Sequence, residues 1–216
     1  MSLKVAVIPV TPLQQNCTVM WDEDTMTGVV IDPGGDVDAL KDAVDGLGIK
    51  IEKILLTHGH FDHVGGAMDL ADDTGAPIIG PHKDDEYITT AVTQRGPEFG
   101  ITDGRDVSGN SWLEEGDTVS FGNQSLSVYH TPGHTPGHIV FVHEEEKIAQ
   151  VGDVLFKGSI GRTDFERSNH ADLISSITTK LWPLGDDVTF IPGHGPASTF
   201  GEERATNPFV GDAELG

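Results

Sequence analysis

The segment from Thr57 to Gly66, THGHFDHVGG, constrains this chain more than any other. It follows a short apolar run and ends in two glycines, which suits a turn between a buried strand and a helix. In a strand, His63 would face away from His58, His60 and Asp62, because alternate residues point to opposite sides. A turn can spread the four side chains, so that one pair serves one metal ion and the second pair another. Imidazole nitrogens and carboxylate oxygens suit zinc and its first-row neighbours.

The alternative for this segment is a polar loop whose side chains cap a helix. A single histidine on a loop is usually of that kind, but three histidines and an aspartate over positions 58–63 favour a metal site. Three further candidate ligands follow apolar runs and stand beside glycine, where the backbone can approach a metal ion closely. They are His134 in TPGHTPGH, Asp153 in VGDVLF and His194 in IPGHG.

Together these motifs resemble those of the metallo-β-lactamase superfamily and, within it, the glyoxalase II-like hydrolases of the small single-domain YcbL type. The resemblance extends over nearly the whole chain, from QQNC near the start to NPFV near the end. It implies an α/β (α+β) fold, a four-layer αββα sandwich with the ligands on loops at one edge where the sheets meet. It also implies a ligand set: His58, His60 and His134 for the first metal ion, Asp62, His63 and His194 for the second, and Asp153 bridging both.

The resemblance further implies a hydrolase that uses two divalent metal ions, with zinc expected first and iron or manganese admitted by the same donors. Two such cations lower the pKa of a shared water from its ordinary high value towards ~7, so that the bridging hydroxide can attack a carbonyl without a separate base. The catalytic carboxylates, Asp62 and Asp153, then act by holding the cations. A thiol pKa near ~8.5 makes a thiolate a good leaving group. The expected substrate is a thioester such as S-lactoylglutathione, as for a hydroxyacylglutathione hydrolase.

Basic residues are scarce, yet Lys157, Arg162 and Arg167 lie within eleven positions soon after Asp153. The segment KGSIGRTDF resembles the stretch in which relatives hold the glycine carboxylate of glutathione. We expect Lys157 or Arg162 to contact an anionic end of the substrate; the alternative is that they neutralise nearby acids. Only 22 residues follow His194, so we expect one domain over residues 1–216, without the C-terminal helical domain that completes the glutathione pocket in two-domain relatives.

Other functions remain open at this point. Persulfide dioxygenases share the implied fold, and their GRTDF stretch resembles residues 161–165; a single iron would then be held by His58, His134 and Asp153. Against this, every ligand of the second site is present, and His138 stands where those dioxygenases usually have cysteine. A metallohydrolase of another ester or thioester and a non-enzymatic metal-binding scaffold are further alternatives. Hydrolysis of β-lactams is disfavoured because the chain lacks a late cysteine.

The charge of the chain bounds its partners. There are 35 acidic residues against 13 basic ones, for a formal net charge of −22. Such a surface repels nucleic acids and anionic membranes, which counts against a nuclease. The expected partner is a small thioester, whose anionic end Lys157 or Arg162 would contact. A dense carboxylate surface is screened by salt, so the composition also fits a saline habitat. The sequence leaves the oligomeric state open.

The single cysteine, Cys17, excludes an intrachain disulfide and agrees with a reducing, cytoplasmic location. We interpret it as a small buried hydrophobe. No apolar run approaches the ~20 residues that a membrane helix needs, and no signal peptide is evident. Behind the ligands, Asp32 is expected to accept a hydrogen bond from a ligand histidine or else to be a turn residue, and His130 and His138 are candidates for similar supporting roles.

Periodicity and turn residues predict the elements of the fold. A helix over 37–47 should be capped by Asp36 and ended by Gly48. The segment 96–109 shows no periodicity and is predicted as a loop. Further helices are predicted over 67–74, 83–93 and 171–181. Strands are predicted at 5–8, 16–21, 28–31, 53–56, 77–79, 118–121, 125–130, 138–143, 147–151 and 188–191.

Overall fold

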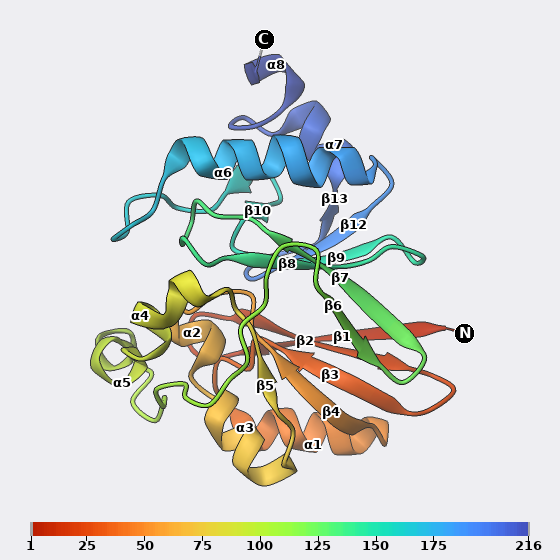
Figure 1. The fold of residues 1–216 in the computed structure, drawn as a ribbon, viewed down its shortest axis with the longest axis vertical. Coiled ribbons are helices and arrows are strands. Elements are labelled where there is room, and N and C mark those ends of the chain that lie inside the picture. The colour runs from red at the N-terminus through yellow and green to blue at the C-terminus, as the bar shows by residue number, and fades with distance from the viewer. Residues whose placement is uncertain (1, 216) are drawn as a thin grey trace.

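Two β-sheets packed face to face form the centre of the computed structural model, which describes residues 2–215 (Figure 1). The first sheet has the order β1-β2-β3-β4-β5 and the second β13-β12-β9-β8-β7-β6. The first contains β1 (Leu3–Val10), β2 (Gln15–Asp22), β3 (Thr27–Ile31), β4 (Lys50–Leu55) and β5 (Ile78–Ile79). The second contains β6 (Thr118–Phe121), β7 (Gln124–His130), β8 (Ile139–His143), β9 (Ile148–Gly152), β12 (Thr189–Pro192) and β13 (Ser198–Thr199). A separate hairpin pairs β10 (Leu155–Phe156) with β11 (Ser159–Ile160).

Helices cover the outer face of each sheet (Figure 1). The first sheet carries α1 (Val37–Leu47) and α3 (Ala67–Thr74), and the second carries α6 (His170–Ser176) and α7 (Phe200–Thr206), with α8 (Asp212–Leu215) beyond. The short helices α2 (Phe61–Val64), α4 (Glu86–Thr89) and α5 (Val92–Arg95) gather at the left-hand edge in Figure 1. The predicted αββα sandwich is therefore confirmed.

The four layers follow from alternation of apolar residues along the central strands. In β8, Ile139 and Phe141 pack between the two sheets, whereas Val140 and Val142 pack against the helices outside. Side chains of successive strand residues point to opposite faces, so a strand that is apolar throughout must be covered on both sides. Strand β3 is built in the same way, with Ile31 between the sheets and Val30 under the helices of the first sheet.

Several predicted elements differ from the structure. Helix α1 begins and ends as expected, with Gly48 in the left-handed conformation, but Asp36 makes no side-chain cap. Its carboxylate instead accepts a hydrogen bond from the amide of Thr11 at 2.7 Å, and this ties the helix start to the β1–β2 connection. The predicted helix over 83–93 is wrong as a single helix: it is a 3-10 turn followed by α4 and α5, interrupted at Thr90 and Ala91.

Two other segments also depart from the expected form. The predicted helix over 171–181 is α-helical in α6 and then widens to a π-helix over Ile177–Leu181. The segment 96–109 is a loop that opens with a 3-10 turn at Gly96–Phe99. The short pieces β10, β11, β13, α7 and α8 complete the described chain without having been predicted.

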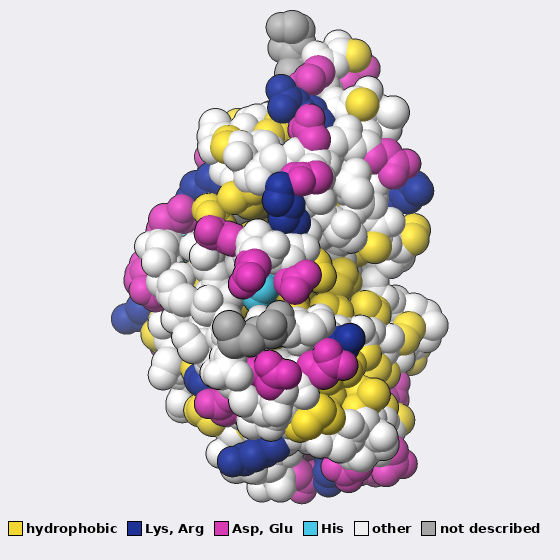
Figure 2. All heavy atoms as spheres, turned by 90° about the vertical axis from the view of Figure 1, so that its right-hand side faces the viewer, with side chains coloured by type: hydrophobic (Ala, Val, Ile, Leu, Met, Phe, Trp, Pro, Cys, Tyr) yellow, Lys and Arg dark blue, Asp and Glu magenta, His cyan; other side chains and the backbone are white. Residues whose placement is uncertain are grey.

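The surface shown in Figure 2 carries acidic side chains over both halves of the molecule, with scattered basic ones. Most of the basic side chains already lie in ion pairs, such as Lys41 with Asp73 at 2.7 Å and Arg105 with Asp69 at 2.6 Å. Within residues 2–215, no helix combines the length and the apolar character that crossing a membrane requires. Cys17 is fully buried, as predicted.

Candidate metal centre

Four connections that end at one edge of the sandwich bring the seven expected ligands together. The turn between β4 and α2 supplies His58 and His60, and the β7–β8 connection supplies His134. Asp62 and His63 lie in α2 itself, so the end of the segment predicted as a turn is a short helix. Asp153 follows the end of β9, and His194 follows the end of β12. Strands β9 and β12 are parallel neighbours, which places Asp153 and His194 at the same end of the second sheet.

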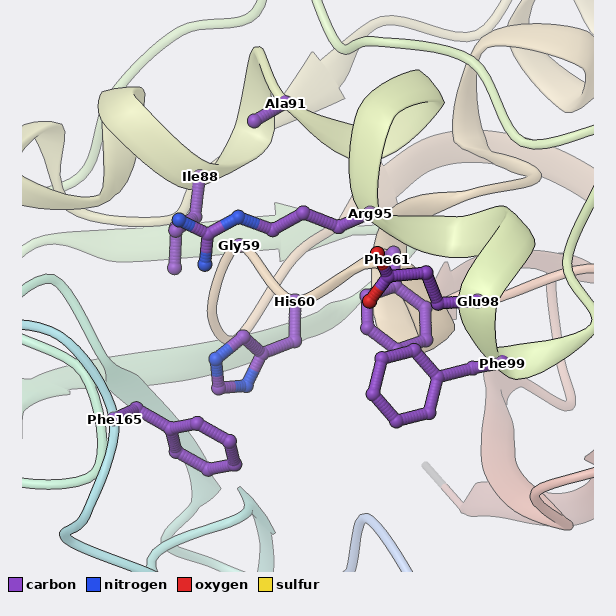
Figure 3. Close-up of a pocket in the computed structure, with 9 residues that line it drawn as sticks. All are labelled: Gly59, His60, Phe61, Ile88, Ala91, Arg95, Glu98, Phe99 and Phe165. Carbon is purple, nitrogen blue, oxygen red and sulfur yellow. The ribbon is translucent and has the colours of Figure 1, made fainter.

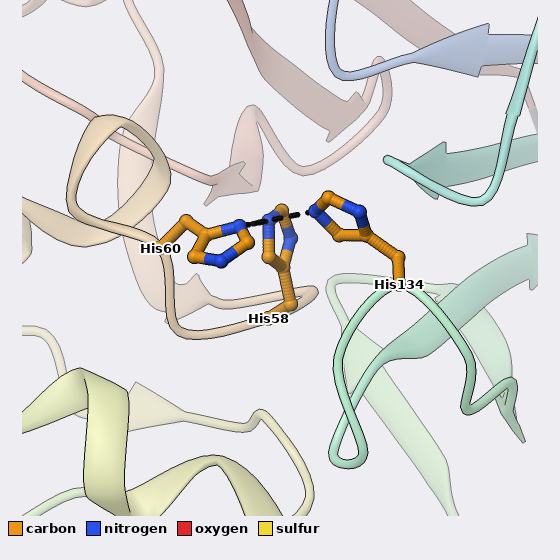
Figure 4. A group of neighbouring side chains, drawn as sticks. All are labelled: His58, His60 and His134. Atoms are coloured by element: carbon orange, nitrogen blue, oxygen red, sulfur yellow. Dashed lines mark hydrogen bonds between the residues drawn. The ribbon is translucent and has the colours of Figure 1, made fainter. Parts of the chain in front are cut away.

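The first group consists of three imidazoles (Figure 4). His60 Nδ1 lies 3.1 Å from His58 Nε2 and 3.0 Å from His134 Nε2. The three rings meet edge to face, with interplanar angles of 78° to 85°, so their nitrogens converge from different directions on one point. Three convergent imidazole nitrogens suit a transition-metal ion.

The second group consists of Asp62, His63 and His194. His194 Nε2 lies 3.2 Å from Asp62 Oδ2, and His63 Nε2 lies 3.9 Å from the same oxygen. Asp153 stands between the groups: one carboxylate oxygen is 3.4 Å from His63 Nε2, and the other is 3.6 Å from His134 Nε2. One carboxylate thus faces donors of both groups.

Hydrogen bonds on the far side of the rings determine which nitrogen of each histidine carries the proton. His134 Nδ1 donates to the carbonyl oxygen of Arg162 at 2.8 Å, and His194 Nδ1 donates to that of Leu13 at 3.3 Å. Because a carbonyl can only accept, Nδ1 carries the proton in both rings. Their Nε2 atoms keep a free lone pair that points to the centre, as metal coordination requires.

Asp32 determines which ring nitrogen carries the proton in His63 and, through Thr57, in His58. It is fully buried and accepts a hydrogen bond from His63 Nδ1 at 2.8 Å, so the predicted supporting contact is confirmed. The hydroxyl of Thr57 also donates to Asp32, at 2.6 Å. Since that hydroxyl has only one proton, it accepts from His58 Nδ1 at 3.0 Å. His58 and His63 therefore also present Nε2 lone pairs to the centre.

The donor set fits divalent metal ions on two further observations. His63 Nε2 and Asp153 Oδ1 are buried and have no hydrogen-bond partner among the described residues. Buried polar atoms are normally paired, so these two lack a partner that a cation would supply. Gly193 packs so closely on the centre that a methyl group there would overlap the carboxylate of Asp153 and the ring of His63.

The buried ligands shift one another's pKa values. Burial lowers the pKa of His58 well below its usual range and that of His60 to about 3, with the neighbouring histidines adding to the effect. Burial by itself would raise the pKa of Asp153, but the facing His63, His134 and His194 hold it below its usual range. Burial by itself would lower the pKa of His63 and His194, but the facing Asp62 and Asp153 raise both, so a cation bound here would have to displace the protons that these two rings favour.

Asp85 joins two of the ligand-bearing segments, a role that the sequence did not reveal. It is fully buried and receives three hydrogen bonds: from the amide of Gly59 at 2.9 Å, the hydroxyl of Thr135 at 2.7 Å and the amide of Gly137 at 2.6 Å. Gly59 lies between two ligands of the first group, and Thr135 follows the third. We call residues 57–66, which follow β4, the metal loop. The carboxylate of Asp85 therefore links the metal loop to the β7–β8 connection, which carries His134. Its position among consecutive acidic residues suggested only a helix start.

His138 and His130 lie in different surroundings. The ring of His138 is buried and stacks on His58 with 4.7 Å between centroids, and its Nε2 accepts the amide proton of Asp153 at 3.0 Å. It therefore positions the backbone of a ligand and keeps no nitrogen free for a metal ion. His130 stacks on His82 instead and bonds the carbonyl of Pro136, outside the centre.

A cavity of about 630 Å³ opens over the two groups of ligands. Arg162 lines it and pairs with Asp164 through two hydrogen bonds of 2.9 and 2.7 Å, with its guanidinium 4.6 Å from the centre of the Phe165 ring. Lys157 does not line this cavity, and its ammonium lies 3.4 Å from Glu202. The remaining walls are mostly apolar and are formed by Leu13, Phe61, Phe99, Phe156 and Phe165.

Comparison with known proteins agrees with this geometry. The chain is 42% identical to hydroxyacylglutathione hydrolase GloC of Haemophilus influenzae, over 96% of this chain and 98% of that one. The crystal structure of BLEG-1 B3 metallo-β-lactamase has a TM-score of 0.88 and 33% identity, covering 96% of this chain and 99% of that chain. The structure of TTHA1623 in a di-iron-bound form has a TM-score of 0.87 and 33% identity, covering 95% of this chain and 100% of that chain.

The family model of the metallo-β-lactamase superfamily matches residues 10–194, a span that holds all seven converging side chains. The relative with 42% identity aligns along almost its full length, so the similarity includes the elements outside the metal loops. The chain belongs to the metallo-β-lactamase superfamily and, within it, to the glyoxalase II-like family.

Proposed function

We propose that this protein is a binuclear metallohydrolase that cleaves thioesters, with S-lactoylglutathione as the first substrate to test. The observation that carries the proposal is the pair of donor groups that face Asp153 from two sides under one cavity. The identity of 42% to hydroxyacylglutathione hydrolase GloC supports the choice of substrate.

The residues of the chain have distinct parts in such a reaction. Two divalent cations at these donors would supply an activated water near neutral pH and polarise the thioester carbonyl. Asp32 and the carbonyls of Arg162 and Leu13 keep the ligand rings in the tautomer that leaves their lone pairs free. Arg162, at the rim of the cavity, would orient an anionic end of the substrate.

The metal ions and the cellular setting are part of the proposal. Zinc is the first choice for these nitrogen and oxygen donors, and iron is the second, because TTHA1623 has been crystallised in a di-iron form. A reducing cytoplasm would suit both the buried, unpaired Cys17 and a free-thiol product.

The proposal is tested by metal analysis of the purified protein together with thiol release from S-lactoylglutathione. We expect two metal ions per chain and rapid, metal-dependent release of thiol. One iron per chain, no thiol release and oxygen uptake with glutathione persulfide would replace the proposal by a persulfide dioxygenase. The similarity to BLEG-1 makes a β-lactam the second substrate to assay, and cleavage of the β-lactam without thioester cleavage would also overturn the proposal.

A further inference from the structure

A second cavity, of about 290 Å³, opens directly beside the metal centre. It shares four residues with the larger cavity: His60, Phe61, Phe99 and Phe165. From there it extends away from the other ligands towards α4 and α5, where Ile88, Ala91 and Arg95 form its far wall (Figure 3). We call this space, with these walls, the side chamber.

Helices α4 and α5 supply the far wall of the side chamber. Ile88 lies in α4, Ala91 immediately precedes α5 and Arg95 ends it, a spacing that brings the three side chains to one side of these helical turns. Gly59 forms the floor, and its backbone packs so closely on Ile88 that a methyl group there would overlap that side chain. The chamber is therefore held against the metal loop by direct packing.

The walls of the side chamber have the chemistry of an aromatic binding site. Phe61 and Phe99 stack with 4.8 Å between ring centroids, and Phe165 lies edge to face with His60 at 5.0 Å. Phe99 and Phe165 remain 51% and 38% exposed, so both have apolar surface left for a ligand. The guanidinium of Arg95 reaches along the wall towards Ile88 and donates a hydrogen bond to Glu166 at 3.3 Å (Figure 3). Glu98 also lines the chamber, so the aromatic walls stand beside one basic and one acidic side chain.

The size of the side chamber decides what it can hold. An apolar cavity of about 150 Å³ accommodates benzene, so a chamber of 290 Å³ has room for a phenyl group and its linker. The methyl group of a lactoyl ester would leave most of the apolar wall in contact with water, which is unfavourable. A charged peptide carrier such as glutathione needs polar partners, and these stand at the wider cavity next to Arg162.

Resting on the proposed function, we propose that the side chamber is the acyl subsite and selects thioesters with an aromatic acyl group. The carbonyl carbon lies at the metal centre, the aromatic ring enters the side chamber and the thiol carrier occupies the larger cavity. The oxygen of water bonds to the acyl carbon and the carbon–sulfur bond breaks. The products are an aromatic carboxylate, a proton and the free thiol.

The test compares two substrates that differ only at the acyl side chain. S-Mandeloylglutathione carries a phenyl group where S-lactoylglutathione has a methyl group, and both have the same hydroxyl and the same thiol. We expect a kcat/KM at least tenfold higher for the mandeloyl ester. Ala91→Phe fills the chamber and should lower kcat/KM for the mandeloyl ester at least tenfold more than for the lactoyl ester. The deciding quantity is kcat/KM for the mandeloyl ester divided by kcat/KM for the lactoyl ester. A value of one or less in the wild type, or the same value in Ala91→Phe as in the wild type, overturns the inference.

Two controls separate this inference from the proposed function. Ala205→Phe adds the same ring to the exposed side of α7, and it should leave the ratio of the two substrates unchanged. Should Ala91→Phe fail to fold, Phe99→Ala removes an exposed aromatic wall and should lower the same ratio. If neither thioester is cleaved, the proposed function fails. Binding of mandelate and lactate, measured by calorimetry, then tests the side chamber independently of catalysis. Tighter binding of mandelate to the wild type than to Ala91→Phe supports the subsite, and equal binding overturns it.

Discussion

At the scale of single residues, Asp85 governs how the two ligand loops are held together. It accepts three hydrogen bonds from Gly59, Thr135 and Gly137, and no solvent reaches it. Burial raises its pKa to about 6, while the three donors favour the ionised form. At neutral pH the side chain is therefore mostly a carboxylate, a group that can accept from all three donors at once.

Asp85→Asn should weaken the first metal group without touching a ligand. The amide places a donor where one of three donors now points, so we expect the unfolding free energy of the metal-free protein to fall by about 1–3 kcal/mol. Metal affinity should fall by roughly 10-fold or more, as it does when groups that support ligands are removed. Denaturant titration and competition with a coloured chelator measure the two quantities. Asp84→Asn, at the exposed neighbour, is the control, and equal metal affinity in the two variants would refute the coupling of the loops.

Arg162→Ala tests recognition of the anionic end of the substrate. Arg162 lines the cavity over the ligands, whereas Lys157, from the same segment, does not. We therefore expect Arg162→Ala to raise KM for S-lactoylglutathione about tenfold with little change in kcat, and Lys157→Ala to have a smaller effect. Steady-state kinetics of both variants decide this, and an unchanged kcat/KM in Arg162→Ala would show that this residue only neutralises Asp164.

The sequence and the structure contribute differently at this scale. The seven candidate ligands were found from sequence because chemistry requires particular residue types beside glycines and at the ends of apolar runs. Asp85 could not be found in this way, since its three partners lie 26 to 52 positions away and its own neighbours suggested a helix start. Which nitrogen of each histidine carries the proton also depends on backbone carbonyls that only the folded chain brings into place.

At the scale of elements, the loop from Asp32 to Gly35 supports the metal loop from below. Gly34 lies against the first residues of α2, and a methyl group there would overlap the carbonyl oxygen of Asp62. Gly66 donates its amide proton to the carbonyl of Pro33 at 2.9 Å, which holds the two loops in register. The two turns must therefore pack as one unit for Asp62 and His63 to lie beside His194.

Gly34→Ala should displace the metal loop and lower both stability and metal content. We expect a clear decrease in Tm and loss of the second metal ion, measured by thermal unfolding and metal analysis. Gly46→Ala is the matched control: Gly46 lies in α1 with open space around it, and alanine there should stabilise the helix by up to about 1 kcal/mol. Similar Tm values for the two variants would contradict the packing argument.

Most long elements were predictable from sequence because their periodicity is strong. Strands such as β8 are apolar on both faces, and α1 has its buried residues Leu40 and Val44 four positions apart. The two-residue strands β10, β11 and β13 are too short to show any period. The segment 83–93 begins with acidic residues that suit a helix start but continues with the β-branched Thr89, Thr90 and Val92. β-Branched residues have low helix propensity, which agrees with the interruption at Thr90 and Ala91.

At the scale of the whole molecule, the net charge of −22 is the dominant electrostatic feature. Most basic side chains already pair with acids at the surface, where such pairs contribute little. Repulsion among the remaining carboxylates is screened by salt, because the Debye length falls from about 30 Å at 0.01 M to about 3 Å at 1 M. We therefore expect Tm to rise between these salt concentrations. Thermal unfolding in increasing sodium chloride measures this, and an unchanged midpoint would show that repulsion does not limit stability.

The central claim is that two groups of ligands from two sheets act as one binuclear centre. The most direct test is titration of zinc into chelator-stripped protein while thiol release from S-lactoylglutathione is followed. We predict that activity rises until two equivalents are bound, and that Asp62→Asn and His194→Ala bind one equivalent tightly and lose most activity while remaining folded. Full activity at one equivalent, or full activity in either variant with one metal ion bound, would contradict the account.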